Sequence, residues 1–512
     1  MEYDYVIVGA GSAGCVLANR LTADPGVTVA LVEAGGQDDK LEIRMPAGFK
    51  KLFKTAYDWN YITTGQDEMD GRELYWPRGR VIGGSSSMNA QMWVRGHERD
   101  YDQWEIPGWS YDEVLPYFKK AEHRVGSNRG GVYGTQGPLH ISELRSPNVT
   151  TAAFLMACEE LGMRRLDELN GRSNEGCSPT PVTQERGRRW SAADGYLRPA
   201  AKRPNLTVLT GAQVGRVLFE GRRAVAVEHG GGRVRARREV ILSAGAIGSP
   251  HLLMLSGVGA ADELRESGIE VVHDLPAVGK NLQDHLSSGV FVACPEPITL
   301  VAAESIGNLV RYLVTRTGML TTNVGEAVAF VRTSPEEPAP DIELVFAPGP
   351  FVDHGLSVPA GHGLTVGVIL LQPESRGRIG LNGREAVVDP AYLSAPADVR
   401  RMVAGLKVAK QVFATAAMKQ YNDGPLEPYW GPESDEELAR WVRERGETLY
   451  HPVGTCRMGV DEESVVDPSL RVRGVEGLRV VDASIMPTLN RGHTHAPAVM
   501  IGEKGADLIA TY

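Results

Sequence analysis

The chain has 512 residues, of which 42% are hydrophobic and 23% are charged, the balance of an ordinary globular protein. Its length exceeds what a single hydrophobic core serves, so we expect two or three structural units. The formal net charge of −10 argues against nucleic acid or an anionic membrane as the main partner, because both are bound by clustered Lys and Arg.

The first elements in chain order predict a dinucleotide-binding unit. An apolar run at 5–8 predicts a strand buried on both faces, and helical spacing of apolar residues predicts a helix at 13–21. A second strand is expected at 27–32, and it ends on the acidic residue Glu33. This is the strand, glycine turn, helix, strand and acid order of a nucleotide site.

Three glycines between the first strand and the helix have separate tasks. Gly9 allows a tight turn, Gly11 lets the backbone approach a pyrophosphate, and Gly14 lets the helix pack on the strand. The pyrophosphate is expected at the helix N-terminus, at Ser12, where free N–H groups favour an anion. Glu33 is expected to accept hydrogen bonds from the adenosine ribose. The unit by itself leaves FAD and NAD both open.

Further along, a second group of elements is expected in the nucleotide unit. Segments 224–227 and 233–237, joined by the glycines at 230–232, predict a hairpin. Segment 239–245 predicts a strand ending in small residues, where the backbone can approach a nucleotide closely. The polar segment 279–285 is expected to be a loop at the surface of its domain.

The middle of the chain predicts a mixed sheet with helices. Apolar alternation at 342–346 and an apolar run at 364–371 indicate strands. A helix is expected after Asp398. Ser434 and Glu437 form the pattern of a capping box and predict the start of another helix.

Several short motifs, spread from residue 5 to about residue 509, together resemble one family. They read GRVIGGSSSMNAQMWVRG at 79–96, GAIGSPHLLMLSGVG at 245–259, GKNLQDH at 279–285, HPVGTCRMG at 451–459, VVDAS at 480–484 and HAPAVMI at 495–501. With the N-terminal unit, and in this order, they resemble the glucose–methanol–choline (GMC) oxidoreductases. The style is closest to bacterial choline dehydrogenase-like and alcohol dehydrogenase members.

The resemblance implies an α/β fold with a Rossmann-like FAD-binding domain of the GMC type. An α+β substrate-binding domain, built on an antiparallel or mixed sheet, is expected to be inserted into it. The FAD-binding domain is expected at 1–45, 75–155, 205–290 and 450–512, and the substrate-binding domain at 46–74, 156–204 and 291–449. No second GxGxxG follows a strand, so a separate NAD(P)H domain is not expected.

Two histidines are the candidates for catalysis. Alcohol oxidation needs a base for the hydroxyl proton, and histidine titrates close to neutral pH. By resemblance, His451 faces the flavin and the substrate, and His495 stands where the family has His or Asn; either one could take the proton. His493, where many bacterial relatives have Asn, is expected to be a neighbour without catalytic duty. Surface or packing roles are expected for His97, His285 and His354.

The resemblance also implies the remaining cofactor contacts. The segment 80–89 is expected to wrap the flavin, the backbone of Val214 to contact adenine, and Asp482 to lie near the pyrophosphate. Met88 occupies the place of the histidine that carries covalent flavin in some members, so FAD is expected to be bound non-covalently. The other expected contacts are Val81, Gly84, Ser85, Asn89, Ala483 and Pro497. An aromatic pocket is expected from Trp93, Phe351, Trp430 and Tyr450, although each is as well suited to packing.

These features predict an enzyme that oxidises an alcohol to an aldehyde or ketone by hydride transfer to flavin N5. The partners expected are a small-molecule alcohol and either oxygen or a quinone-type acceptor, with a slight preference for oxygen. A flavin-containing lyase of the hydroxynitrile-lyase type is the alternative, and an NAD-binding protein without flavin is a third possibility.

Compartment and thiol chemistry are expected to be those of the cytoplasm. The five cysteines lie far apart and form no CxxC pair, which favours free, mostly buried thiols over disulfides or a zinc site. No basic stretch precedes the first strand, so a secretory signal is not expected. No apolar run, such as the one at 364–371, is long enough to span a bilayer.

Overall fold

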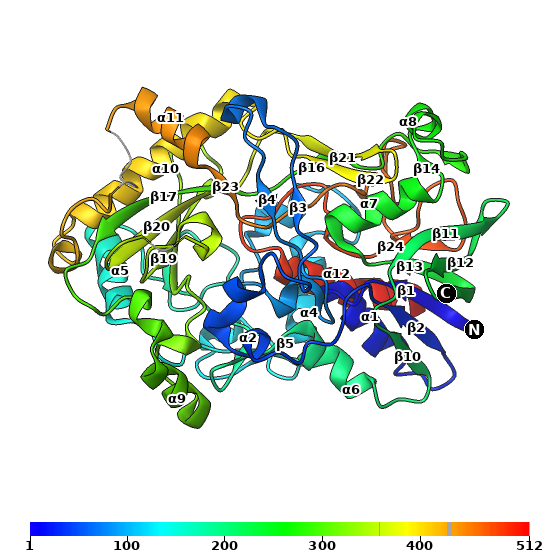
Figure 1. Cartoon of the computed structure of the whole chain (residues 1–512), viewed down its shortest axis with the longest axis horizontal. Helices are drawn as coiled ribbons and strands as arrows, with labels where there is room; N and C mark the ends of the chain where they lie inside the picture. Colours follow the sequence, from blue (N-terminus) through cyan, green and yellow to red (C-terminus); the bar gives the residue numbers. More distant parts are fainter. Residues whose placement is uncertain (358, 428–432, 511–512) are drawn as a thin grey trace.

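The computed structural model, which describes residues 1–357, 359–427 and 433–510, is built around two separate sheets. A seven-stranded sheet lies at the end of the molecule that holds both termini, and a five-stranded sheet lies at the other end (Figure 1). The α/β fold class is confirmed.

Parallel strands make up most of the larger sheet, in the order β10-β2-β1-β13, with β24 beside the second half of β13. The antiparallel strands β11 and β12 extend it from the first half of β13, where the predicted hairpin is confirmed. The strands are β1 (Glu2–Val8), β2 (Val29–Val32), β10 (Leu206–Leu209), β11 (Val214–Glu220), β12 (Arg223–His229), β13 (Gly232–Leu242) and β24 (Leu478–Val480).

The second strand begins two residues later than its apolar run predicted. The N–H of Val27 closes a turn onto the carbonyl of Asp24, and Thr28 bonds the Asp4 side chain. These local bonds occupy backbone groups of Val27 and Thr28 that would otherwise have been available for pairing with a neighbouring strand.

Helix α12 (His495–Ala510) crosses the centre of the molecule and packs on α1 (Ser12–Leu21) and α4 (Tyr111–Ala121). The approach to α1 is close at Gly502, where a Cβ atom would lie 2.9 Å from the Cβ of Val16. This packing brings the start of the last helix next to the start of the first one.

The smaller sheet is antiparallel throughout, in the order β18-β19-β20-β17-β23. Helix α10 packs on it, and α11 begins at the predicted capping box of Ser434 and Glu437. The elements are β17 (Leu286–Ala293), β18 (Ala327–Val331), β19 (Ile342–Ala347), β20 (Gly363–Leu370), β23 (Glu447–Thr448), α10 (Pro396–Ala414) and α11 (Asp435–Arg445).

The expectation of a surface loop at 279–285 is wrong. Residues Lys280–Leu282 form strand β16, which pairs with β21 (Gly377–Asn382), and the residues at 283–285 are buried. Polarity misled the prediction because these polar side chains are satisfied inside the protein by partners from distant segments. Asp284, for example, accepts hydrogen bonds from Tyr392 and Thr448.

The remaining elements connect and cover the two sheets. His97 caps α3 in a packing role, as expected. The helices are α2 (Leu41–Arg44), α3 (Glu98–Asp102), α5 (Val149–Glu160), α6 (Arg198–Ala200), α7 (Gly245–Leu255), α8 (Ala261–Glu266) and α9 (Ile306–Thr315). The short strands are β3 (Tyr61–Ile62), β4 (Tyr75–Trp76), β5 (Glu122–Arg124), β6 (Leu139–Ile141), β7 (Gly176–Pro179), β8 (Gln184–Glu185), β9 (Arg188–Arg189), β14 (Val258–Gly259), β15 (His273–Asp274) and β22 (Glu385–Asp389).

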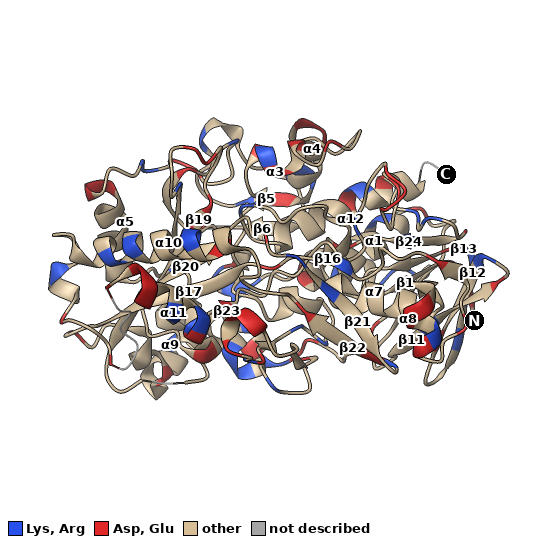
Figure 2. Ribbon diagram, turned by 90° about the horizontal axis from the view of Figure 1, so that it is seen from above, with Lys and Arg blue, Asp and Glu red and all other residues tan. Residues whose placement is uncertain are grey.

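Charge and thiol placement agree with the composition. Figure 2 shows basic and acidic residues interspersed along the ribbon. All five cysteines are free and buried, as expected. Over the described ranges, no helix combines the length and the apolar character needed to cross a membrane.

Candidate functional site

A cavity of about 1030 Å³ extends from the larger sheet to the smaller one. At one end it is lined by residues that follow the carboxyl ends of β1, β2 and β13, the place where open α/β sheets bind ligands. At the other end it is lined by β17, β19 and β20. The volume is at the upper limit of small-molecule sites, roughly 300–1,000 Å³, and suits a large cofactor together with a substrate.

Most of the residues expected at the site do line this cavity. They are Gly9, Gly11, Ser12, Glu33, Gly84, Ser85, Asn89, Val214, His451, Asp482, Ala483 and His495. Gly14, Val81 and Pro497 are not among the lining residues. Gly14 has the packing task expected of it, since a Cβ there would lie 1.9 Å from the carbonyl oxygen of Gly9.

The cradle for a pyrophosphate is present at the start of α1. Gly9 has φ +100°, and a Cβ on it would lie 2.5 Å from the carbonyl oxygen of Ser243. A Cβ on Gly11 would touch nothing closer than 3.8 Å, so the absence of a side chain there keeps the cavity open. No side chain caps the helix at Gly11, which leaves its first N–H groups to an anion. The residues present therefore fit a dinucleotide.

Glu33 is held rigidly at the end of β2. Its carboxylate accepts hydrogen bonds from the backbone N–H groups of Ala10, at 2.8 Å, and Gly35, at 2.7 Å. Burial raises the pKa of Glu33, and these hydrogen bonds oppose the shift. Each oxygen keeps a second lone pair, as a contact to ribose hydroxyls requires.

Asp482 joins two elements that border the cavity. It accepts hydrogen bonds from the N–H of Gly245, at 2.9 Å, and from the hydroxyl of Ser249, at 2.5 Å, both in α7. It also accepts one from the N–H of Ser484, at 2.8 Å. Asp482 therefore holds the start of α7 against the turn that follows β24.

His451 is connected to a chain of hydrogen bonds inside the protein. Its backbone N–H donates to Asp284 over 2.6 Å, which fixes the main chain. Its Nδ1 atom lies 2.9 Å from Nδ1 of His285, and Nε2 of His285 lies 3.1 Å from the carbonyl oxygen of Leu371.

This chain determines which nitrogen of His451 carries a proton. A carbonyl only accepts, so Nε2 of His285 must donate, and Nδ1 of a neutral His285 must accept. His451 therefore carries its proton on Nδ1 and has an unprotonated Nε2. Burial lowers the pKa of His285 to about 3 and that of His451 well below its ordinary value, with further lowering by neighbouring histidines. Both rings are therefore neutral at pH 7, which leaves Nε2 of His451 able to accept a proton.

His495 is the first residue of α12 and lies beside the start of α1. Its Nδ1 atom is 3.0 Å from the hydroxyl of Ser12, and its ring packs edge to face with Trp93. Its Nε2 atom is buried and has no hydrogen-bond partner within the protein. Burial lowers the pKa of His495 to about 4, with a smaller contribution from Arg189. A neutral ring with one unsatisfied nitrogen suits a bound ligand.

His493 lines the cavity and has an ionisable partner of its own. Its Nε2 atom lies 3.0 Å from the Glu343 carboxylate, and both side chains are buried. The rings of His493 and His451 are nearly perpendicular, with centroids 4.9 Å apart. His493, which was expected to have no catalytic duty, is thus in direct contact with the ring of His451.

Aromatic side chains form part of the cavity lining. Phe351 and Tyr450 are among them, whereas Trp93 is not and instead donates its indole N–H to Glu122 over 2.8 Å. The hydroxyl of Tyr450 lies 2.6 Å from Nδ1 of His354. Trp430 lies outside the described residues. Further lining aromatics are Phe49, Phe53, Trp59, Tyr61, Phe291 and Trp441.

Sequence reasoning missed four polar residues that form hydrogen bonds with residues of this site. His285 and Asp284 lie in the segment predicted to be a surface loop. Their position in the GKNLQDH motif was the signal that could have identified them as site residues. Glu343 stood within an apolar strand pattern, where a buried acid is itself a signal. Arg189 carried no signal in the sequence.

Comparisons with known proteins agree with this geometry. A family model described as GMC oxidoreductase matches residues 3–287, and a second one with the same description matches residues 373–502. An uncharacterized GMC-type oxidoreductase of Mycobacterium tuberculosis is 52% identical over 530 residues, covering 99% of both chains. An alcohol dehydrogenase [acceptor] of Pseudomonas putida is 44% identical over 526 residues, covering 99% of this chain and 95% of the relative. The crystal structure of pyridoxine 4-oxidase from Mesorbium loti matches with a TM-score of 0.90 and 34% identity, covering 100% of this chain and 99% of that one.

Proposed function

Because the chain belongs to the GMC oxidoreductase family, whose members bind FAD, we propose that it oxidises a primary or secondary alcohol to an aldehyde or ketone. The observation that carries this proposal is the hydrogen-bond chain that leaves Nε2 of His451 unprotonated beside the cavity. Bound FAD supplies the hydride acceptor.

In this proposal the two histidines divide the work. His451 accepts the hydroxyl proton of the alcohol on Nε2, because its other nitrogen is already protonated and bonded to His285. His495 orients the substrate oxygen through its unpartnered Nε2. The aromatic lining excludes water from the alcohol carbon.

Removal of the base tests the proposal. His451→Ala should slow flavin reduction by the alcohol by roughly 10²–10⁴-fold, the usual contribution of a general base. His495→Asn restores the other residue used in the family and should be much less impaired than His495→Ala. Stopped-flow bleaching under anaerobic conditions measures all three variants. A wild-type rate for His451→Ala would show that His451 is not the base.

The same experiment separates the alternatives. Turnover of a substrate without bleaching would indicate the lyase, which the oxidoreductase, dehydrogenase and oxidase names of the relatives do not favour. The relatives include both a dehydrogenase and an oxidase, so the acceptor is decided by mixing reduced enzyme with aerated buffer or with a quinone. We expect oxygen to reoxidise it.

We also propose that FAD is bound non-covalently. Met88 stands where a histidyl linkage would form, and its thioether is no nucleophile for that linkage. Acid precipitation should leave the yellow colour in the supernatant. Colour that stays with the pelleted protein would contradict the proposal.

A further inference from the structure

Arg189, in β9, is a fully buried arginine whose hydrogen-bond partners are all uncharged. Its Nε atom donates to the carbonyl of Ile43 over 2.8 Å. Its Nη1 atom donates to the carbonyl of Ser86, at 3.1 Å, and to the side-chain oxygen of Asn89, at 2.7 Å. Its Nη2 atom is buried without a partner.

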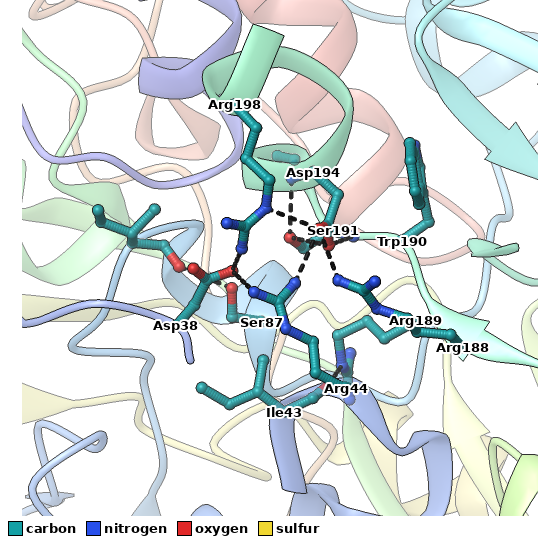
Figure 3. Close-up of polar contacts among 12 residues, drawn as sticks. Asp38, Ile43, Arg44, Ser87, Arg188, Arg189, Trp190, Ser191, Asp194 and Arg198 are labelled. Atoms are coloured by element: carbon teal, nitrogen blue, oxygen red, sulfur yellow. Dashed lines mark hydrogen bonds and ion pairs between the residues drawn. The ribbon is translucent and has the colours of Figure 1, made fainter. Parts of the chain in front are cut away.

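Two carboxylates in the same region, those of Asp38 and Asp194, form ion pairs with other arginines (Figure 3). Asp194 lies 2.8 Å from Arg44, 2.9 Å from Arg198 and 3.4 Å from Arg188. Asp38 pairs with Arg44 and Arg198 as well. Two carboxylates therefore serve three guanidinium groups.

The charge of Arg189 is thus left uncompensated by a direct ion pair. Burial lowers the pKa of Arg189 to about 9, which still leaves it charged at neutral pH. An unpaired buried charge is costly to a fold. An anionic charge that arrives with a ligand, or that forms during the reaction, would offset the cost of burying the Arg189 charge.

Asn89 connects the Arg189 guanidinium to the cavity, because it bonds Arg189 and also lines the cavity. The side-chain oxygen of Asn89 accepts hydrogen bonds from Arg189 and from the N–H of Gln91. The orientation of the amide is thereby determined, and its NH₂ group is the donor left for a ligand. Asn89 lines the cavity, and Arg189 is close enough to His495 to contribute to the lowering of its pKa.

The reaction itself creates a matching negative charge. In the proposed reaction, breaking the carbon–hydrogen bond of the alcohol would move two electrons and one proton to FAD, while the hydroxyl proton would go to His451. The cofactor would therefore gain one negative charge. Both catalytic histidines start neutral, so neither supplies a permanent positive charge before the substrate binds.

We propose that Arg189 is a positioning residue that supplies a permanent positive charge beside this site, holds the Asn89 amide as a donor and favours the reduced state of bound FAD. The inference rests on the proposed function for the identity of the electron donor. Its electrostatic part concerns only this chain and FAD, because preorganised charge stabilises the charge that develops.

The test is the reduction equilibrium of bound FAD, measured against a reference dye with no alcohol present. Arg189→Met should lower the ratio of reduced to oxidised FAD about tenfold at a given solution potential and pH, a shift of about 30 mV for a two-electron couple. Arg188→Met is the matched control, since it removes a neighbouring positive charge that, unlike that of Arg189, is ion-paired with Asp194; its ratio should equal that of the wild type. Equal ratios for Arg189→Met, Arg188→Met and the wild type would overturn the proposal.

A second pair of variants covers the case in which Arg189→Met fails to fold or to retain FAD. Arg189→Lys retains the positive charge without the several N–H donors of the guanidinium group, whereas Arg189→Gln retains a donor for Asn89 without the charge. The proposal requires a higher reduced fraction for Lys than for Gln, and equal fractions would overturn it. Because no alcohol is involved, a protein that failed to oxidise alcohols would still give a clear result here.

Discussion

At the scale of single residues, the proposed role of His451 as a base depends on His285, which is not among the residues that line the cavity. His285 keeps the proton of His451 on Nδ1 because its own Nε2 is committed to the carbonyl of Leu371. His285→Phe preserves an aromatic ring and removes the acceptor. We expect alcohol-dependent flavin reduction to slow about tenfold, since one lost hydrogen bond is worth roughly 1–1.5 kcal/mol.

The substrate dependence of that rate separates positioning from a loss of structure. A positioning role predicts a lower limiting rate with an unchanged KM, and recovery in His285→Gln, whose amide oxygen can accept the Nδ1 proton. Equal impairment of the Phe and Gln variants would show that ring packing, rather than the hydrogen bond, is what His285 provides.

At the scale of elements, the crossing of β1 and α1 makes different demands on two neighbouring glycines. Gly14→Ala would place a Cβ 1.9 Å from the carbonyl oxygen of Gly9, so the helix must move away from the strand. We expect a loss of about 1–3 kcal/mol in the free energy of unfolding, together with loss of FAD. Gly11→Ala meets no protein atom closer than 3.8 Å, so it should lose FAD while keeping apoprotein stability within about 1 kcal/mol.

Urea unfolding of the two apoproteins and FAD titration measure this contrast. Retention of FAD by Gly11→Ala would mean that the backbone there does not approach the cofactor.

At the scale of the whole molecule, burial of neutral histidines makes stability depend on pH. His495 has a folded pKa of about 4, against an ordinary value of 6.5, so between these values the unfolded chain binds the proton more tightly. Stability is therefore lost as the pH falls from 6.5 toward 4, and His495 alone costs about 2 kcal/mol at pH 5. Asp284 acts in the opposite direction, because burial raises its pKa to about 6.

A difference measurement isolates His495. His495→Asn removes the titrating group, so its free energy of unfolding should fall by about 2 kcal/mol less than that of the wild type between pH 7 and pH 5. Urea unfolding at both pH values, with the same excess of FAD, measures the difference. An identical pH dependence in the two proteins would mean that His495 is not buried as a neutral ring.

The sequence by itself determined what depends on short-range pattern. The β1–α1–β2 unit, the hairpin of β12 and β13, and the capping box at Ser434 are each formed within a short stretch of chain, so spacing and residue type reveal them. The motifs that resemble the GMC oxidoreductases gave the family. The domain boundaries and the roles of the site residues stay predictions.

Only the tertiary structure decided which distant residues pair by hydrogen bonds around the site. His285 meets His451 across 166 positions, Glu343 meets His493 across 150, and Arg189 meets Asn89 across 100. These pairings depend on how the two sheets and α12 come together, which no local pattern encodes. Burial also changes how polar residues are to be interpreted. The segment 279–285, whose polarity suggested a surface loop, is largely buried and bonds His451, because distant partners satisfy its hydrogen bonds.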